Sequence, residues 1–212
     1  MHHPLSSIDP SAKIARNVVI EPFVSIEKNV EIGSGTWIGS NVTIMEGARI
    51  GKNCEIFPGA VISAIPQDLK FAGEESFVII GDNTIIRECA TVNRATSATG
   101  KTVVGDNCLI MAYAHIAHDC YVGNNSIIVN NVALGGHVII GEYAIIGGLT
   151  AVHQFVKIGD HTMISGGSLV RKDVPPFVKA GREPLSFIGI NSIGLRRRNF
   201  IESEIEEIQN IY

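Results

Sequence analysis

The sequence predicts an all-β fold, a parallel β-helix of hexapeptide repeats that is followed by a short α-helical extension. Every sixth residue from Ile8 to Val170 is Ile, Val or Leu, except at Asp68, Glu74 and Ala98. A helix needs spacings of three and four and an ordinary amphipathic strand a spacing of two, so a period of six indicates a short strand and a turn. Three repeats then form a triangular coil of about eighteen residues, and successive coils stack about 4.8 Å apart.

The corners of the coils also have a sequence signature. Glycine often follows the inward aliphatic residue, as at Gly33 and Gly141, and Asn or Asp often comes next, as in Gly81-Asp82-Asn83. These residues tolerate the unusual backbone angles of tight turns. We therefore expect one corner in every repeat.

Two domains follow from this pattern. The β-helix is expected over residues 1–176, with loop insertions at about 65–77 and 94–101 that replace faces of the coil, because the six-residue phase resumes after each. The two prolines of Asp173-Val-Pro-Pro end the ladder, since proline cannot donate a hydrogen bond to it. Residues 177–212 are expected to form the partly helical extension.

The extension contains one clear helix signal. Ser203 is the expected N-cap, and Glu206 completes a capping box with it. Apolar residues recur at helical spacing up to Tyr212, so we expect the helical part to be truncated.

Composition limits the location and the partners. Charged residues make up only 18% of the chain, which is consistent with surface hidden in an oligomer, and the net charge of −4 favours neither nucleic acid nor an anionic membrane. No signal peptide or 18-residue apolar stretch is present, so we expect a cytoplasmic protein without membrane insertion. The cysteines form no CxxC pair and are expected to be free thiols: Cys54, Cys89, Cys108 and Cys120.

The histidines gather in one part of the repeat region. A coil of eighteen residues places His118, Gly136 and Gln154 in one column. The next column holds Asp119, His137 and Phe155. His115 and His153 belong to the same segments, so all of these residues are expected to converge on one edge, within roughly two strand spacings. His161 falls outside both columns and is interpreted as a surface residue.

Such a cluster suits acyl transfer to an alcohol. A neutral imidazole is a good general base near pH 7, and a glycine N–H beside it can stabilise an oxyanion. No Ser or Cys nucleophile is indicated nearby, so direct attack by the acceptor hydroxyl is favoured. Zinc bound by three histidines from adjacent coils or subunits stays open as an alternative.

Three further features permit two interpretations each. Gly148 and Gly166 are eighteen residues apart, so they either border a groove for an alkyl chain or serve corners. The loop segment 67–70 either binds substrate or is merely solvated. The arginines at 196–198 either pair with phosphate or stabilise the end of a helix.

Four motifs together resemble the UDP-N-acetylglucosamine acyltransferases over essentially the whole chain. They are His115-Ile-Ala-His-Asp-Cys, Gln67-Asp-Leu-Lys-Phe-Ala-Gly-Glu, Gly147-Gly-Leu-Thr-Ala-Val-His-Gln-Phe and Asp173-Val-Pro-Pro-Phe-Val. The resemblance implies a left-handed β-helix, a homotrimer with active sites between subunits, and no cofactor or metal. It also implies transfer of a 3-hydroxyacyl chain from acyl carrier protein to the 3-hydroxyl of UDP-N-acetylglucosamine, the first step of lipid A synthesis.

The resemblance also implies residue roles. His118 would be the general base, Asp119 its partner and Gly136 the oxyanion donor. Direct pairing of His118 with Asp119 is an open question, because consecutive strand residues point to opposite faces. The residues implied to bind substrate are Gln67, Asp68, Lys70, His115, His137, Gly148, His153, Gln154, Gly166, Asn191, Arg197 and Arg198.

One departure and three rival functions complete the expectations. Ile193 stands where some family members carry an acidic residue near the nucleotide. The rivals are the N-acyltransferase of the same pathway, a zinc-dependent β-helical carbonic anhydrase, and a non-catalytic scaffold. The first has an extra N-terminal domain, for which a repeat that begins at Ile8 leaves no room.

Overall fold

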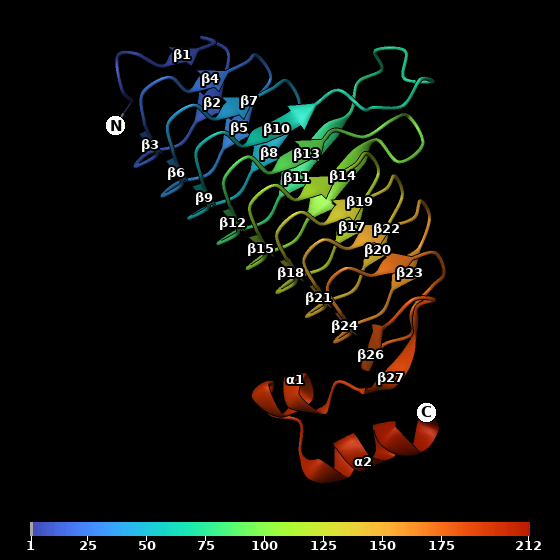
Figure 1. Cartoon of the computed structure of the whole chain (residues 1–212). Helices are drawn as coiled ribbons and strands as arrows, with labels where there is room; N and C mark the ends of the chain where they lie inside the picture. Colours follow the sequence, from blue (N-terminus) through green and yellow to red (C-terminus); the bar gives the residue numbers. More distant parts are fainter. Residues whose placement is uncertain (1) are drawn as a thin grey trace.

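The computed structural model describes residues 2–212, which form a left-handed parallel β-helix with three sheets and two C-terminal helices (Figure 1). The first sheet contains β1 (Ser7–Ile8), β4 (Ser25–Ile26), β7 (Thr43–Ile44), β10 (Val61–Ala64), β13 (Thr91–Asn93), β16 (His115–Ile116), β19 (Ala133–Leu134), β22 (Ala151–Val152) and β25 (Leu169–Val170). The second contains β2 (Lys13–Ile14), β5 (Glu31–Ile32), β8 (Ala48–Ile50), β11 (Phe77–Ile80), β14 (Lys101–Val104), β17 (Tyr121–Val122), β20 (Ile139–Ile140) and β23 (Lys157–Ile158). The third contains β3 (Val19–Ile20), β6 (Trp37–Ile38), β9 (Glu55–Ile56), β12 (Ile85–Ile86), β15 (Leu109–Ile110), β18 (Ile127–Ile128), β21 (Ile145–Ile146), β24 (Met163–Ile164), β26 (Val178–Gly181) and β27 (Ser186–Ile190).

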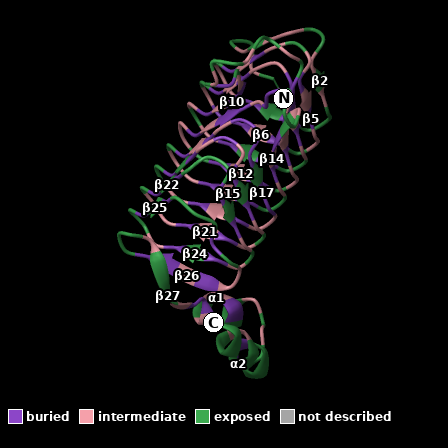
Figure 2. Ribbon diagram, turned by 90° about the vertical axis from the view of Figure 1, so that its right-hand side faces the viewer, coloured by how far each residue is buried: buried purple, intermediate pink, exposed green. Residues whose placement is uncertain are grey.

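The predicted period of six is confirmed by the strand register. Ile110 pairs with Ile128 and Ile128 with Ile146, so residues eighteen apart stack directly on successive coils. The inward aliphatic residues of these strands are fully buried and form one continuous core. Figure 2 shows buried segments recurring along the coils of the β-helix, whereas much of α2 is exposed.

A second inward position, two residues before each aliphatic, holds small side chains. Three of the free cysteines, Cys54, Cys108 and Cys120, are buried there. Burial raises the pKa of the Cys108 thiol to about 11 and that of Cys120 to about 12. These thiols therefore fill core space and are poor nucleophiles.

The corners confirm the role predicted for asparagine and correct the one predicted for most glycines. Asn53, Asn83 and Asn107 have φ between 52° and 56°, the left-handed conformation that asparagine tolerates. Gly141, by contrast, has no positive φ. A Cβ on it would lie 2.6 Å from the backbone nitrogen of Asp160 on the next coil, so glycine permits close stacking there.

The sequence predicts that the two loops replace faces of the coil, and this prediction is wrong. Both loops are additional residues inserted between complete faces. Val61 pairs with Thr91, thirty residues later, which is one coil of eighteen and twelve additional residues. Phe77 pairs with Lys101, twenty-four residues later, which is one coil and six additional residues. Both insertions are multiples of six, so the phase survives them. Both lie at the corner between the first and second sheets.

The C-terminal part begins later than predicted and its second helix begins earlier. β26 still pairs in parallel with β24, beyond the expected boundary at residue 176, and β27 then returns antiparallel to it. The helices are α1 (Ser192–Arg197) and α2 (Glu202–Ile211). The N-cap of α2 is Ile201, not Ser203, because the carboxylate of Glu204 accepts the Ile201 N–H at 2.9 Å and starts the helix there. Neither helix in the described part of the chain is long and apolar enough to span a bilayer.

Candidate active site

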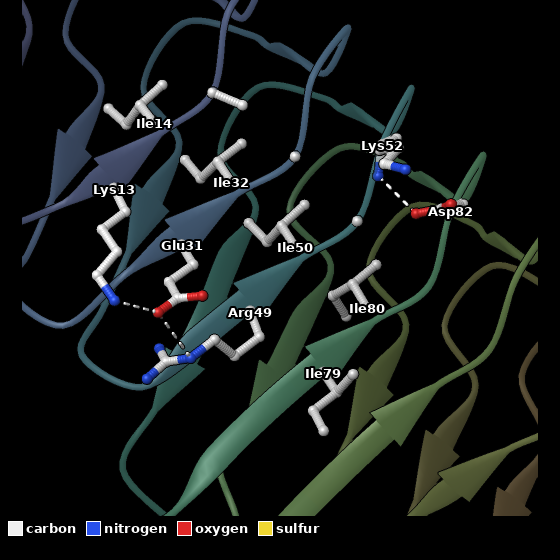
Figure 3. A pocket seen from close by; sticks show the side chains of 13 residues that line it. Lys13, Ile14, Glu31, Ile32, Arg49, Ile50, Lys52, Ile79, Ile80 and Asp82 are labelled. Carbon is white, nitrogen blue, oxygen red and sulfur yellow. Dashed lines mark hydrogen bonds and ion pairs between the residues drawn. The ribbon is translucent and has the colours of Figure 1, made fainter.

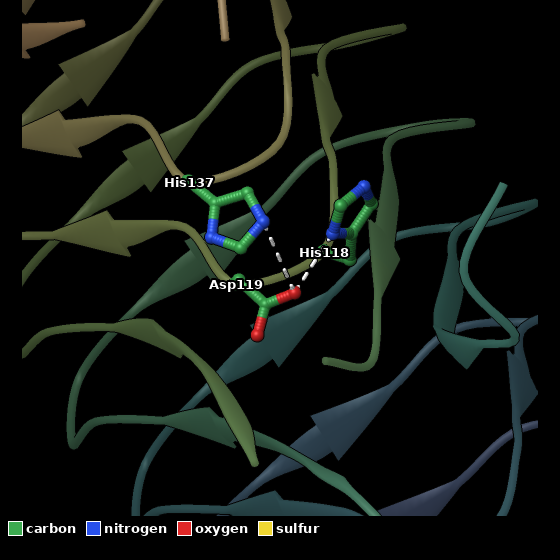
Figure 4. Close-up of side chains that lie close together, drawn as sticks. All are labelled: His118, Asp119 and His137. Atoms are coloured by element: carbon green, nitrogen blue, oxygen red, sulfur yellow. Dashed lines mark hydrogen bonds and ion pairs between the residues drawn. The ribbon is translucent and has the colours of Figure 1, made fainter. Parts of the chain in front are cut away.

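His118 and Asp119 lie at the corner between β16 and β17, and their side chains pair directly. His118 Nδ1 is 2.8 Å from Asp119 Oδ2, as Figure 4 shows. Alternation along a strand would have separated them, but Asp119 has φ +60° and is a corner residue. The left-handed conformation turns its carboxylate back toward the preceding imidazole.

The Asp119 carboxylate is buried and ionised. Its side chain is 0% exposed, and burial by itself would raise its pKa. Hydrogen bonds from Thr99, His118 and Thr96 outweigh burial, and the pKa is lowered. An ionised carboxylate can only accept hydrogen bonds, so His118 carries its proton on Nδ1 and leaves Nε2 as a free base.

Gly136 lies directly beside the His118 ring on the next coil. A Cβ at this position would be 2.5 Å from His118 Cε1 and 2.6 Å from Nε2, so any other residue would displace the imidazole. Within the described chain the Gly136 N–H donates no hydrogen bond, whereas the neighbouring His137 N–H donates to the His118 carbonyl at 3.1 Å. The basic nitrogen and a free backbone donor are therefore adjacent.

His137 and His115 complete the cluster, as the column arithmetic predicted. The His137 ring packs edge-on against His118 at 5.2 Å between centroids and stacks on Phe155 at 4.6 Å. His115, on β16, lies 2.7 Å from the Thr91 hydroxyl of the preceding coil through its Nδ1 atom. Burial, and then the proximity of His118, lower the pKa of His115, so this residue is neutral near pH 7.

The remaining column residues lie nearer to solvent. His153 and Gln154 follow β22 and are exposed, and His153 Nδ1 lies 3.0 Å from the Gln154 carbonyl. Gly148 and Gly166 stack on one another at the corner between the third and first sheets, where a Cβ on Gly166 would lie 3.0 Å from the Gly148 carbonyl oxygen. The two glycines thus leave a strip of bare backbone on the surface.

The residues predicted in the first loop do not reach the cluster within one chain. The Asp68 carboxylate accepts the Lys70 N–H at 2.9 Å and fixes a local turn, while Gln67 and Lys70 are exposed. In the described part of the chain, no hydrogen bond or ion pair joins these residues to the histidines. Their predicted role in binding substrate stays a prediction.

The predicted nucleotide residues lie on or beside α1. Asn191 is buried and serves as the N-cap: its side chain accepts the Gly194 N–H and donates to the His161 carbonyl at 2.8 Å. Arg197 is exposed, and the Arg198 guanidinium lies 5.1 Å from the centre of the Tyr143 ring. The Asn191 side chain is therefore already engaged in structure, whereas Arg197 is free to meet a ligand.

His161 is not the plain surface residue that the sequence suggested. Its ring stacks between Tyr143 and Phe177, with centroid distances of 5.0 and 5.6 Å, and Phe200 packs on its edge. The same left-handed corner position that holds Asp119 and His137 holds His161 on a different edge. Tyr143 lies eighteen residues before His161 and therefore in its column, whereas Phe200 lies outside the repeat, where no spacing could place it.

A zinc ion bound by His118, Asp119 and His137 does not fit the hydrogen bonds of the cluster. Ligand atoms of His118, Asp119 and His137 lie within 4.8 Å of one another. However, Asp119 Oδ2 already accepts hydrogen bonds from His118 Nδ1 and from the Thr96 hydroxyl and N–H, so it has no lone pair left for an ion. A metal would have to break the hydrogen bonds that order the site.

A cavity of about 560 Å³ lies elsewhere, on the outer face of the second sheet near the N-terminus (Figure 3). The ion pairs from Lys13 to Glu31 and from Glu31 to Arg49, at 2.9 and 3.8 Å, run across the coils of this surface. The cavity is shallow and no histidine lines it, and we assign no chemistry to it.

Three family models match parts of the chain. Residues 101–136 match bacterial transferase hexapeptide repeats, and residues 173–212 match the second domain of UDP-N-acetylglucosamine O-acyltransferase. Residues 3–104 match the GMPPB C-terminal domain.

Curated relatives and solved structures agree with the second of these matches. An acyl-[acyl-carrier-protein]–UDP-N-acetylglucosamine O-acyltransferase from Xanthomonas oryzae is 49% identical over 99% of this chain and 81% of its own length. The UDP-N-acetylglucosamine acyltransferase structure from Bacteroides fragilis superposes with a TM-score of 0.98 at 52% identity, covering 99% of this chain and 82% of that one. The Francisella novicida structure gives 0.98 at 45% identity, covering 100% and 78%.

Proposed function

The chain belongs to the acyl-carrier-protein–UDP-N-acetylglucosamine O-acyltransferases, and from this membership we propose that it acylates the sugar 3-hydroxyl of UDP-N-acetylglucosamine. The acyl group is a 3-hydroxyacyl chain held as a thioester on acyl carrier protein. The reaction is the first step of lipid A synthesis and takes place in the cytoplasm.

One observation carries the assignment of the base. The 2.8 Å contact between His118 Nδ1 and the ionised Asp119 carboxylate fixes the imidazole tautomer, so Nε2 is the basic nitrogen. A Cβ on Gly136 would lie 2.6 Å from Nε2, so this nitrogen lies beside a residue whose backbone N–H donates no hydrogen bond in the described chain. A base and an oxyanion donor side by side are what direct acyl transfer to an alcohol requires.

The proposed reaction proceeds by direct attack. His118 Nε2 takes the proton of the sugar 3-hydroxyl while the oxygen bonds to the thioester carbonyl carbon. The carbonyl oxygen becomes an oxyanion, to which the Gly136 N–H donates. The carbon–sulfur bond then breaks, the thiolate of the carrier takes the proton from the His118 imidazolium, and the products are the ester and a free carrier thiol.

The assembly is proposed to be a homotrimer with the site between subunits. No hydrogen bond or ion pair joins Asp68 or Lys70 to His118 among the described residues, so a neighbouring chain is the natural place for their target. The outer face of the third sheet carries an apolar ladder on five successive coils, which suits an interface with a second copy: Ile85, Leu109, Ile127, Ile145 and Met163.

The test is transfer of a 3-hydroxyacyl group from acyl carrier protein to UDP-N-acetylglucosamine, with the wild type and His118→Ala compared. Loss of the base is expected to lower kcat by about 10²–10⁴-fold. His2→Ala, which removes an exposed histidine far from the cluster, is the matched control and should keep full activity.

Two outcomes would contradict the proposal. A wild type that transfers no acyl group from carriers of several chain lengths would refute the activity. A fully active His118→Ala would refute the assignment of the base but not the activity.

A further inference from the structure

The loop between β13 and β14 holds the Asp119 carboxylate from the side opposite His118. The Thr96 N–H and hydroxyl donate to Oδ2 at 3.1 and 2.8 Å. The Thr99 N–H donates to Oδ1 at 3.1 Å, and the Thr99 hydroxyl donates to the same oxygen. Counting His118, both oxygens are surrounded by donors, and the side chain is 0% exposed.

We propose that Thr96 and Thr99 are positioning residues, which act on the reaction through Asp119 by fixing the orientation of its carboxylate and hence the tautomer of His118. This inference rests on the proposed function. In the described chain, the threonines bond to the carboxylate and neither is hydrogen-bonded to the imidazole. Their effect on catalysis should therefore disappear once Asp119 can no longer accept their hydrogen bonds.

The geometry of the loop supports a dedicated role. The six inserted residues are those that interrupt the hexapeptide pattern at Ala98, and a regular coil would have no residues at this place. The Thr96 hydroxyl accepts the Ala98 N–H at 3.2 Å, and the Gly100 N–H donates to the Thr96 carbonyl at 2.9 Å. The loop is thus a closed turn with both threonine hydroxyls directed at one carboxylate.

The first loop supports this turn from outside. The Glu74 carboxylate accepts the Ser97 N–H at 3.1 Å and the Ala72 N–H at 2.8 Å. Glu74 therefore links the loop that carries Asp68 and Lys70 to the turn that orients the base.

Thr99→Val is the most informative variant, because Thr99 is exposed and valine has nearly the same shape. We expect kcat to fall by about 10²-fold with KM for the nucleotide sugar nearly unchanged, since a small misplacement of a catalytic group has this effect. Thr99→Ser, which keeps the hydroxyl, should retain most of the wild-type kcat. Ser97→Ala in the same loop is the matched control, because the Ser97 hydroxyl makes no hydrogen bond in the described chain.

A double-mutant cycle separates positioning from general damage to the fold. In an Asp119→Ala background, adding Thr99→Val should lower kcat less than about threefold, since the side chain that accepts its hydrogen bonds is already gone. An equal loss in both backgrounds would overturn the proposal.

A spectroscopic readout makes the test independent of activity. In ¹⁵N-histidine-labelled wild type, neutral His118 should be a single Nδ1–H tautomer, and Thr96→Val/Thr99→Val should show a mixture. An unchanged single tautomer in the double variant would overturn the proposal. Because no substrate is present, this result stands even if the wild type proves inactive in acyl transfer, so the two failures are distinguishable.

Discussion

At the scale of single residues, the chemistry depends on which nitrogen of His118 is free. The imidazole can carry its proton on either nitrogen, and only a fixed acceptor at Nδ1 leaves Nε2 basic. Asp119 is that acceptor, at 2.8 Å, and its own ionisation is secured by the donors around it. The proposed catalytic pair is therefore the imidazole and the carboxylate, and the turn that holds the carboxylate is proposed to position it.

Asp119→Asn tests this pair directly. The amide can donate to His118 Nδ1 and so favours the wrong tautomer, and we expect kcat to fall by about 10³–10⁴-fold, as for the corresponding change in a Ser-His-Asp triad. Steady-state kinetics with a fixed acyl carrier substrate measure the loss, and circular dichroism checks that the fold is retained. A loss of less than about tenfold in a folded variant would show that the carboxylate does not set the tautomer.

His161 provides a second test at this scale, on stability. Burial, and then the positive charge of Arg198, lower its pKa, while the nearby Asp160 and Glu142 oppose the shift. A histidine whose folded pKa lies below its unfolded value of about 6.5 binds more protons when unfolded. Its contribution to stability is therefore present at higher pH and is lost as the pH falls below about 6.5.

The expected result is a difference in pH dependence between the wild type and His161→Phe. Phenylalanine keeps the stacking with Tyr143 and Phe177 but cannot be protonated. Urea unfolding at pH 8 and pH 5.5 should show a larger loss of unfolding free energy for the wild type than for the variant. Equal losses would mean that His161 is not linked to folding.

At the scale of elements, the corners of the coil share one backbone conformation but carry different loops and side chains. The corner between the first and second sheets carries both insertions and the histidine columns. The corner between the third and first sheets carries the stacked glycines Gly148 and Gly166. Bare backbone at this second corner leaves room for an alkyl chain, which a side chain would occupy.

Gly166→Met is expected to shift the preference of the enzyme toward shorter acyl chains. The new side chain would begin 3.0 Å from the Gly148 carbonyl and cover the strip of bare backbone. Competition between acyl carrier substrates of different lengths measures the shift, and Ser25→Met, on an outer face of an N-terminal coil, is the control. An unchanged preference would remove the two glycines from the acyl site.

At the scale of the whole molecule, the β-helix is a rod whose coils touch mainly their neighbours. Ile128, for example, pairs with Ile110 and Ile146 on the coils beside it. Such a rod keeps its side faces rigid and presents aligned rows of outward residues along its length. The apolar row on the third sheet is one of these, and its residues are half-buried or, at Met163, exposed.

Ile127→Glu is expected to dissociate the proposed trimer, because it places a charge in the middle of the apolar row. Light scattering after size-exclusion chromatography should give three times the mass of one chain for the wild type and one chain mass for the variant. Thr43→Glu, on the outer face of the first sheet, is the matched control and should leave the mass unchanged. A wild type that is monomeric at assay concentrations would contradict the trimer.

Periodicity along the chain is enough to specify the coil, its core and the columns of histidines. A strict period of six fixes the register, and the register fixes which residues stack, so His118, Gly136 and Gln154 can be aligned from their spacing alone. The functional family also followed from motifs spread along the whole chain, and it is confirmed by relatives at 49% identity.

Folding in three dimensions sets what periodicity does not encode. The hydrogen bond between His118 and Asp119 depends on the positive φ of Asp119 at the corner. The donors Thr96 and Thr99 lie in an insertion outside the repeat. The Thr-x-x-Thr spacing at the break in the repeat was the only signal for them. Loops and corners take their conformation from contacts between distant residues, so only the folded chain shows where their side chains point.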